Sequence, residues 1–306
     1  MNENTNLVSA GAGIAGRNKR YVVWFYLLNL VFAHFGASAF SQQAHRVLDH
    51  SLYADKLLHG FDAGVFLELL ARPEFGPTSS STAPAMLFAV MFFLVSLLFM
   101  PGILLGYASD HRLPRDEFYR ACGQNLWRFV RLLLFFAVIA GIAAGILFAV
   151  QNVLVNLAGK TSNERLPFFI LIVGKTIVFL VLTVIRIWFD LAQTDVVLRD
   201  QNAVHRSVAA GLRKTRRNLG RLLGSYVVIA IAALVVLAGG ILLWHAIVPP
   251  SSVVGAFIVG QATLLLLLAA RFWQRATAVA FYVRELAEPV EEEARPIPGF
   301  TSPAVS

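Results

Sequence analysis

The stretch RIWFDLAQTDVVLRDQNAVHRSVAAGLRKTRRNLGR, residues 186–221, joins two long apolar segments of the chain. Its first residues close one apolar segment, its middle carries charges at helical spacing, and its end brings a basic cluster to the start of the next segment. Such a basic amphipathic segment is typical of a helix lying on a membrane surface. We therefore expect its cations to contact anionic lipid headgroups, through Arg213, Lys214, Arg216, Arg217 and Arg221.

The composition agrees with a membrane protein. Of the 306 residues, 57% are hydrophobic and only 14% are charged, whereas a soluble domain has about 25% charged residues. A helix needs about 20 apolar residues to cross a bilayer. Six segments satisfy this length, which predicts an all-α, polytopic bundle of six transmembrane helices, at residues 21–40, 85–107, 129–157, 166–191, 222–248 and 253–287.

The remaining segments are more polar. We expect a flexible tail at residues 1–20, an outer insert with short surface helices at 41–84, an interfacial helix within 108–128, and a disordered acidic and Pro-rich tail at 288–306. The tail sequence GAGIAG has the spacing of a phosphate-binding loop, but no strand precedes it. Residues 17–39 also admit a signal peptide cleaved after Ala39, although the long polar tail and the aromatic-rich apolar run oppose this alternative.

Basic residues are distributed unequally between the two sides of the predicted bundle. If the N-terminus is inside, twenty of the 26 Lys and Arg residues lie on the inner side. This asymmetry follows the positive-inside rule and predicts a multi-pass inner-membrane protein with both termini in the cytoplasm. The net charge of +8 is then explained by topology and lipid contacts, and we expect no nucleic-acid partner because the basic loop 199–221 lacks aromatic residues for base stacking.

Two predicted hairpins look like copies of one unit. Asn125-Leu126-Trp127-Arg128 enters the third span much as Asn218-Leu219-Gly220-Arg221 enters the fifth. The exits match as well, because Arg186-x-Trp188 and Arg271-x-Trp273 are each followed, at the same spacing, by an Arg and an acidic residue. We predict a parallel repeat of helical hairpins, with Asn18 marking the start of a third unit. The Arg-Trp pairs anchor the helices at headgroup depth, or the hairpins enclose a transport path.

Charges inside or beside membrane spans are the candidate functional residues. They are Lys175, within the fourth span, and Arg186, Asp190, Arg271 and Arg275 at the inner boundary. In the repeat alignment Asp190 corresponds to Arg275, and we predict an ion pair between them. Lys175 either contacts a substrate or extends its stem toward the headgroups.

No sequence motif assigns a reaction, a metal or a cofactor. The chain contains neither H-E-x-x-H nor G-x-S-x-G, and it has one cysteine, Cys122, so no cysteine-based zinc site can form. Histidines and aspartates gather in the outer insert, but their spacing matches no standard zinc pattern. We interpret them as solvated side chains (His45, Asp49, His50, Asp55, His59 and Asp62).

The pattern WFDLAQTDVVLRDQNAVHRSVAAGLRKTRRNLGRLL resembles uncharacterised bacterial six-helix integral membrane proteins, in which a D-x-A-x-x-D exit is followed by a cytoplasmic amphipathic helix. It is also distantly similar to the membrane domain attached to some glycerophosphodiester phosphodiesterases. The likeness covers about the last two thirds of the chain and carries over no catalytic residue. It implies a fold and a membrane location, and no reaction.

These observations favour a non-enzymatic inner-membrane protein, either a transport or permeation component or a membrane-organising partner. Its expected partners are the lipid bilayer and, in addition, another protein or a second copy of the chain. One alternative is a polytopic enzyme acting on a lipid or lipid-linked substrate, at the inner boundary charges or in the outer insert. Another is an assembly factor recruited through the basic loop 199–221.

Overall fold

The computed structural model describes residues 6–48, 64, 82–109, 111–159, 165–200, 203–249 and 252–293. Within these ranges the secondary structure is entirely helical. Six helices contain segments long and apolar enough to cross a membrane, so the chain is a polytopic helical membrane protein, as predicted. The helices are α1 (Leu7–Arg17), α2 (Lys19–Leu48), α5 (Thr82–Ala108), α6 (Arg115–Ala158), α7 (Leu166–Leu198), α8 (Val204–Arg217), α9 (Leu219–Ile247) and α10 (Val253–Glu293).

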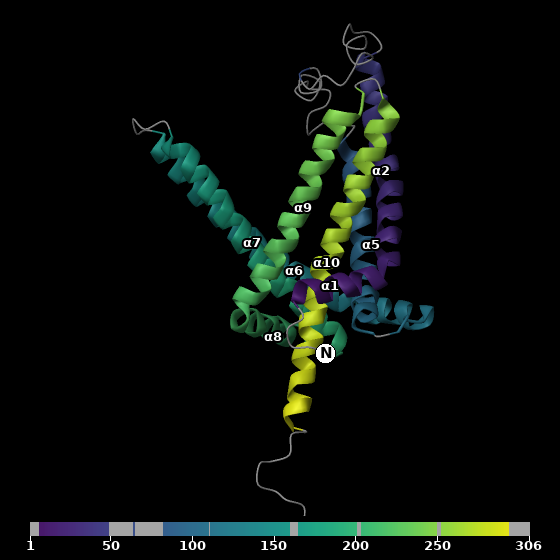
Figure 1. Cartoon of the computed structure of the whole chain (residues 1–306), viewed down its shortest axis with the longest axis vertical. Helices are drawn as coiled ribbons and strands as arrows, with labels where there is room; N and C mark the ends of the chain where they lie inside the picture. The colour runs from purple at the N-terminus through teal and green to yellow at the C-terminus, as the bar shows by residue number, and fades with distance from the viewer. Residues whose placement is uncertain are drawn as a thin grey trace, which may run out of the picture.

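The six long helices are arranged as three packed pairs. The pairs are α2 with α5, α6 with α7, and α9 with α10. Figure 1 shows α2, α5, α9 and α10 running in similar directions, while α7 leans away from α9. The short helices α1 and α8 lie across the long ones at one end of the bundle, which we call the platform end. There α1 packs on α10, and α8 packs on α7.

The buried core is concentrated at the platform end. Its largest fully buried side chains include Phe129 on α6, Ile187 on α7, Tyr226 on α9 and Phe272 on α10. The far halves of α6, α7 and α9 instead expose many large apolar side chains, such as Phe168, which is 62% exposed. Lipid tails are as apolar as these side chains, so exposure to a bilayer carries no hydrophobic penalty. Self-packing is therefore needed mainly where the polar groups lie.

The N-terminal segment differs from the flexible tail expected from its glycines. Residues Leu7–Arg17 form α1, which begins at Asn6, where the side-chain oxygen accepts a hydrogen bond from Val8 N at 3.4 Å. Gly11 is buried against Thr277 of α10 so closely that no Cβ would fit without a shift of the Thr277 backbone. The glycine therefore serves close helix packing rather than flexibility.

Three other boundaries also differ from the predictions. The segment 108–128 is not a separate interfacial helix, because α6 runs unbroken from Arg115 into the membrane span. Helix α2 continues through residues 41–48 of the predicted insert, and α10 continues through residues 288–293 of the predicted disordered tail. Residues 49–63, 65–81 and 294–306 lie outside the described residues, and with them His50, His59, Asp49, Asp55 and Asp62.

The stretch 186–221 resolves into the end of α7, the whole of α8 and the start of α9. Helix α7 is followed by Asp200, whose positive φ of 48° turns the chain away from the helix axis. Asn218, with φ −120° and ψ 27°, separates α8 from α9. Asn18, with φ −107° and ψ 26°, separates α1 from α2 in the same way. The predicted amphipathic helix ahead of the fifth span is thus present.

Candidate functional site

Asp190, near the end of α7, lies at the junction of α7 and α9. Its carboxylate is only 4% exposed and accepts a hydrogen bond of 2.8 Å from the Tyr226 hydroxyl of α9. Arg186, one turn earlier on the same helix, places its Nε 3.8 Å from the same carboxylate. Residues four apart lie on one helix face, so the sequence spacing dictates this second contact.

Two arginines of α10 extend this cluster. Arg271 and Arg275 both interact electrostatically with Asp190 and with Arg186. Three arginines therefore interact electrostatically with one carboxylate, and the formal charge of these four groups is +2. The Nε of Arg275 is buried and has no hydrogen-bond partner among the described residues. A buried cation without a full set of partners is energetically costly, so the cluster has an excess of positive charge to share with an anion.

The predicted direct pair between Asp190 and Arg275 is not formed. Among the described residues, the ion pair within 4 Å of Asp190 is with Arg186, and its interhelical hydrogen bond is with Tyr226. The nearest partners are Tyr226 and Arg186, which both approach the Oδ2 atom of Asp190. Arg275 interacts with Asp190 electrostatically at longer range. It lies beside Phe272, with its guanidinium carbon 5.8 Å from the ring centroid.

A second buried carboxylate, Asp195, lies on α7 five residues after the first. It is 2% exposed and accepts a hydrogen bond from the Tyr282 hydroxyl of α10. Arg199, one turn later, places its Nε 3.8 Å from the carboxylate. Helix α7 thus carries two Asp residues, each paired with an Arg on its own helix and a Tyr on another. The sequence analysis included Asp195 in the D-x-A-x-x-D pattern but did not name it as a candidate site residue, although its i, i+4 spacing to an arginine was visible.

Helix α8 is held by the same region. Lys214 makes an ion pair of 2.7 Å with Glu285 of α10, and its Nζ lies 3.8 Å from the centre of the Tyr282 ring. The Trp188 indole N–H of α7 donates a 2.8 Å hydrogen bond to the Val208 carbonyl of α8. Lys214 therefore points inward, and it is not part of the exposed basic face.

The other four predicted headgroup contacts face outward. Arg213, Arg216, Arg217 and Arg221 are all exposed. A shallow cavity of about 570 Å³ is lined by the first three of these together with Ala209 and Leu212. Exposed cations around a small apolar strip are typical of a helix at a membrane interface.

Lys175 lies apart from these clusters. It is exposed on the far half of α7, on the surface that the bundle does not cover. The neighbouring Gly174 faces the buried Gln151 of α6, whose side-chain N–H donates a 3.3 Å hydrogen bond to Leu171. Lys175 is fifteen residues before Asp190 on α7, which is about 22 Å along the helix axis at 1.5 Å per residue.

Metal-binding groups do not converge within the described part of the chain. There, no three His, Cys, Asp or Glu side chains come close enough together to hold an ion. His45 is exposed near the end of α2. Cys122 is buried, and its Sγ lies 3.9 Å from the Phe99 carbonyl oxygen.

The chemistry open to this site is electrostatic. Each buried carboxylate accepts one hydrogen bond from a tyrosine and lies 3.8 Å from the Nε of an arginine, so both already have structural partners. The groups that remain available to interact with an anion are the surplus guanidinium groups. Comparisons with protein-family models, curated proteins and solved structures found no match to this chain.

Proposed function

We propose that the protein is a non-enzymatic, membrane-organising protein of the inner membrane that gathers anionic lipids at its platform end. The observation that carries this proposal is how the charged residues are distributed between the interior and the surface. Asp190 and Asp195 are buried and hydrogen-bonded to tyrosines of other helices, whereas Arg213, Arg216 and Arg217 are exposed together on α8. The buried charges fix the helices, and the exposed ones are free to bind lipid.

The proposed orientation places the platform end in the cytoplasm. It is supported by the excess of basic residues at this end, which the positive-inside rule assigns to the cytoplasmic side. Anionic lipids of the cytoplasmic leaflet attract each nearby Lys or Arg by about 1 kcal/mol. Both termini then lie in the cytoplasm.

We infer further that the chain contains a repeated unit, an amphipathic helix followed by a hairpin. Two equivalent contacts support this inference. Trp188 of α7 donates a 2.8 Å hydrogen bond to Val208 of α8, and Trp273 of α10 donates one of the same length to Val8 of α1. Val8 and Val208 are 200 positions apart, as are the separating residues Asn18 and Asn218.

The close-packing glycines repeat with the same spacing. Gly11 approaches Thr277, and Gly211, 200 positions later, approaches Ala192. Thr277 and Ala192 are each four residues after the tryptophan of their own helix. The start of α6 fits as the amphipathic part of a third unit, because its Phe118 packs on Gly102 of α5. In this arrangement each amphipathic part rests on the second span of a neighbouring hairpin.

The lipid proposal is tested by extracting the protein from membranes in polymer-bounded lipid discs. The ratio of phosphatidylglycerol to phosphatidylcholine in the discs is measured by mass spectrometry. A variant with Arg213, Arg216, Arg217 and Arg221 all changed to Gln should bring this ratio down toward that of the bulk membrane. The matched control changes Lys175 and Arg165, at the other end of α7, and should keep the wild-type ratio. An unchanged ratio in the fourfold variant would refute the proposal.

A transport or permeation component is the second candidate, and one observation favours it. The far half of α7 exposes both Lys175 and large apolar residues such as Phe168 and Phe169. A second copy of the chain packed there would enclose Lys175. In a Cys122→Ser background, Lys175→Cys should then form disulfide-linked dimers in membranes. A purely monomeric product under oxidation would argue against this candidate.

A further inference from the structure

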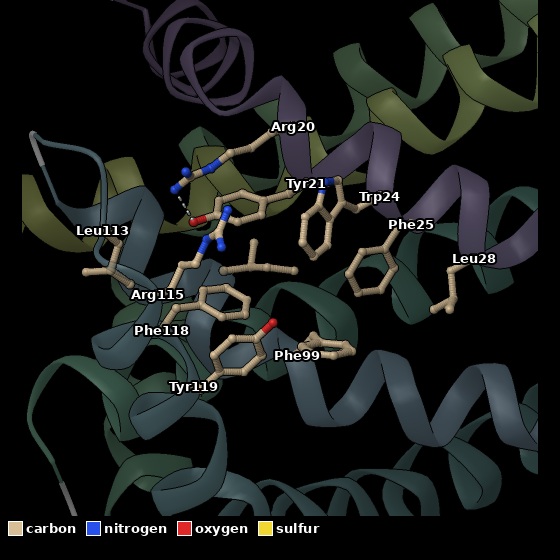
Figure 2. A pocket seen from close by; sticks show the side chains of 11 residues that line it. Arg20, Tyr21, Trp24, Phe25, Leu28, Phe99, Leu113, Arg115, Phe118 and Tyr119 are labelled. Atoms are coloured by element: carbon tan, nitrogen blue, oxygen red, sulfur yellow. Dashed lines mark hydrogen bonds between the residues drawn. The ribbon is translucent and has the colours of Figure 1, made fainter.

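A cavity separate from the α8 arginines lies at the platform end between α2, α5 and the first turns of α6. Its volume is about 550 Å³, within the range of roughly 300–1,000 Å³ typical of small-ligand sites. Figure 2 shows the side chains that line it, which come from all three helices. The cavity is therefore a site built by tertiary packing rather than by one helix surface.

One wall of the cavity is aromatic. The ring of Phe118 is stacked between those of Tyr21, at a centroid distance of 5.7 Å, and Phe99, at 6.2 Å. Phe25 and Leu28 of α2 continue the apolar lining. Trp24, which is 64% exposed, stands at the edge. A flat row of rings with aliphatic neighbours matches the shape and polarity of an extended hydrocarbon chain.

The polar groups of the cavity are gathered on one side. Figure 2 shows the guanidinium groups of Arg20 and Arg115 on either side of the Tyr21 hydroxyl. Arg20 donates a 2.9 Å hydrogen bond to that hydroxyl and lies 4.8 Å from the Tyr21 ring centre. Arg115 has no hydrogen bond or ion pair to any described residue, and the described residues that line the cavity include no carboxylate.

We propose that this cavity binds one anionic phospholipid. Its phosphate lies between Arg20 and Arg115, which offer planar forks of N–H donors suited to phosphate oxygens. One acyl chain follows the aromatic wall of Tyr21, Phe118 and Phe99, while the rest of the lipid stays in the bilayer. The inference rests on the membrane location of the chain and not on the lipid-gathering role of α8, whose arginines do not line this cavity.

The charge of the site sets the expected selectivity. Two basic groups at an interface each favour an anionic lipid by about fivefold, so the pair favours it by about 25-fold. The double variant Arg20→Gln/Arg115→Gln should lose that preference and retain the apolar cavity. The matched control Arg112→Gln/Arg120→Gln removes two exposed arginines of the same region that do not line the cavity.

The experiment is native mass spectrometry of the full-length protein in detergent, titrated with phosphatidylglycerol, phosphatidylcholine or inorganic phosphate. The wild type and the control should retain one phosphatidylglycerol with about 25-fold preference over phosphatidylcholine, and inorganic phosphate should not displace it. Leu28→Trp, which fills the apolar part and keeps both arginines, should lose retention of either lipid.

Two results would overturn the proposal: equal preference for phosphatidylglycerol in the double variant and the wild type, or full displacement of the lipid by inorganic phosphate. The fourfold α8 variant separates this site from the proposed function. It should still retain the single lipid, even where the bulk lipid ratio around the protein has changed.

Discussion

Neutralising Asp190 should destabilise the platform end, and a second substitution should restore part of the lost stability. Asp190→Asn keeps the size of the side chain but removes the negative charge that interacts with Arg186, Arg271 and Arg275. Breaking a buried ion pair by removing one partner costs about 3–5 kcal/mol, because the other charge stays buried. Since Arg186 and Arg271 are partly exposed here, we expect a loss near the lower limit, about 3 kcal/mol.

The second substitution, which should restore part of the stability, is at Arg275. Its guanidinium has a buried Nε without a hydrogen-bond partner among the described residues, and its attraction to Asp190 disappears in the variant. Arg275→Met replaces it by an apolar chain of similar length, an exchange that is often neutral or stabilising once the charge has no counterion. The double variant Asp190→Asn/Arg275→Met should therefore recover about 1–2 kcal/mol of the loss, as expected for residues that are coupled.

The assay is reversible unfolding in mixed micelles with increasing SDS, followed by tryptophan fluorescence and far-ultraviolet circular dichroism. Lys175→Met in the Asp190→Asn background is the control, because it removes a cation that is remote from the cluster. This control should recover none of the lost free energy of unfolding. The reasoning is refuted if Asp190→Asn leaves the unfolding free energy unchanged, or if Lys175→Met restores as much stability as Arg275→Met.

Four further variants test the contacts that hold the platform end. Trp188→Phe and Trp273→Phe each remove one interhelical hydrogen bond of 2.8 Å. Each should lower the free energy of unfolding by about 0.5–1.5 kcal/mol. Clearly unequal losses in SDS unfolding would argue against the inferred repeat. Gly11→Ala should lower the free energy of unfolding by about 1–3 kcal/mol by overpacking, because its Cβ would lie 2.9 Å from the Thr277 backbone. Gly13→Ala is the control and should show no loss of stability, because there is open space around Gly13. Tyr282→Phe should cost about 1.5–3 kcal/mol, because it removes a hydrogen bond to the buried carboxylate of Asp195; an unchanged unfolding midpoint would contradict this.

Hydropathy was sufficient to predict the long helices, because a bilayer imposes both length and composition on a span. The predicted span 85–107 agrees closely with α5 (Thr82–Ala108). The ends were less predictable. Helix α6 has charged residues in its first turns that suggested a break, yet the helix runs unbroken through Asn125. Asn18 and Asn218, the same residue type in a similar local sequence, do end their helices.

The partners of the buried charges could not be predicted from the sequence. Asp190 was identifiable as a charge at the end of a span, but its partner Tyr226 is 36 residues away. Tyr282 is 87 residues from Asp195. Which tyrosine meets which carboxylate depends on how α9 and α10 are rotated about their axes, and neither helix concentrates its apolar residues on one face. Their sequence pattern therefore carries little information about rotation.

The apolar surroundings of a bilayer also explain why most of the interhelical polar contacts lie at the platform end. In a bilayer, apolar side chains gain little by packing against one another instead of lipid, so helix association relies on close packing and interhelical hydrogen bonds. At the platform end both devices are present: glycines at two crossings, and tyrosine–aspartate bonds from α9 and α10 to α7. Along the far half of α6 and α7 the described contacts include one buried amide, Gln151, which bonds to Leu171. The hairpin is thus attached firmly at its platform end and weakly beyond it. A ligand or a second copy of the chain that binds along the far half would change the angle of the hairpin without breaking the Asp190 and Asp195 contacts.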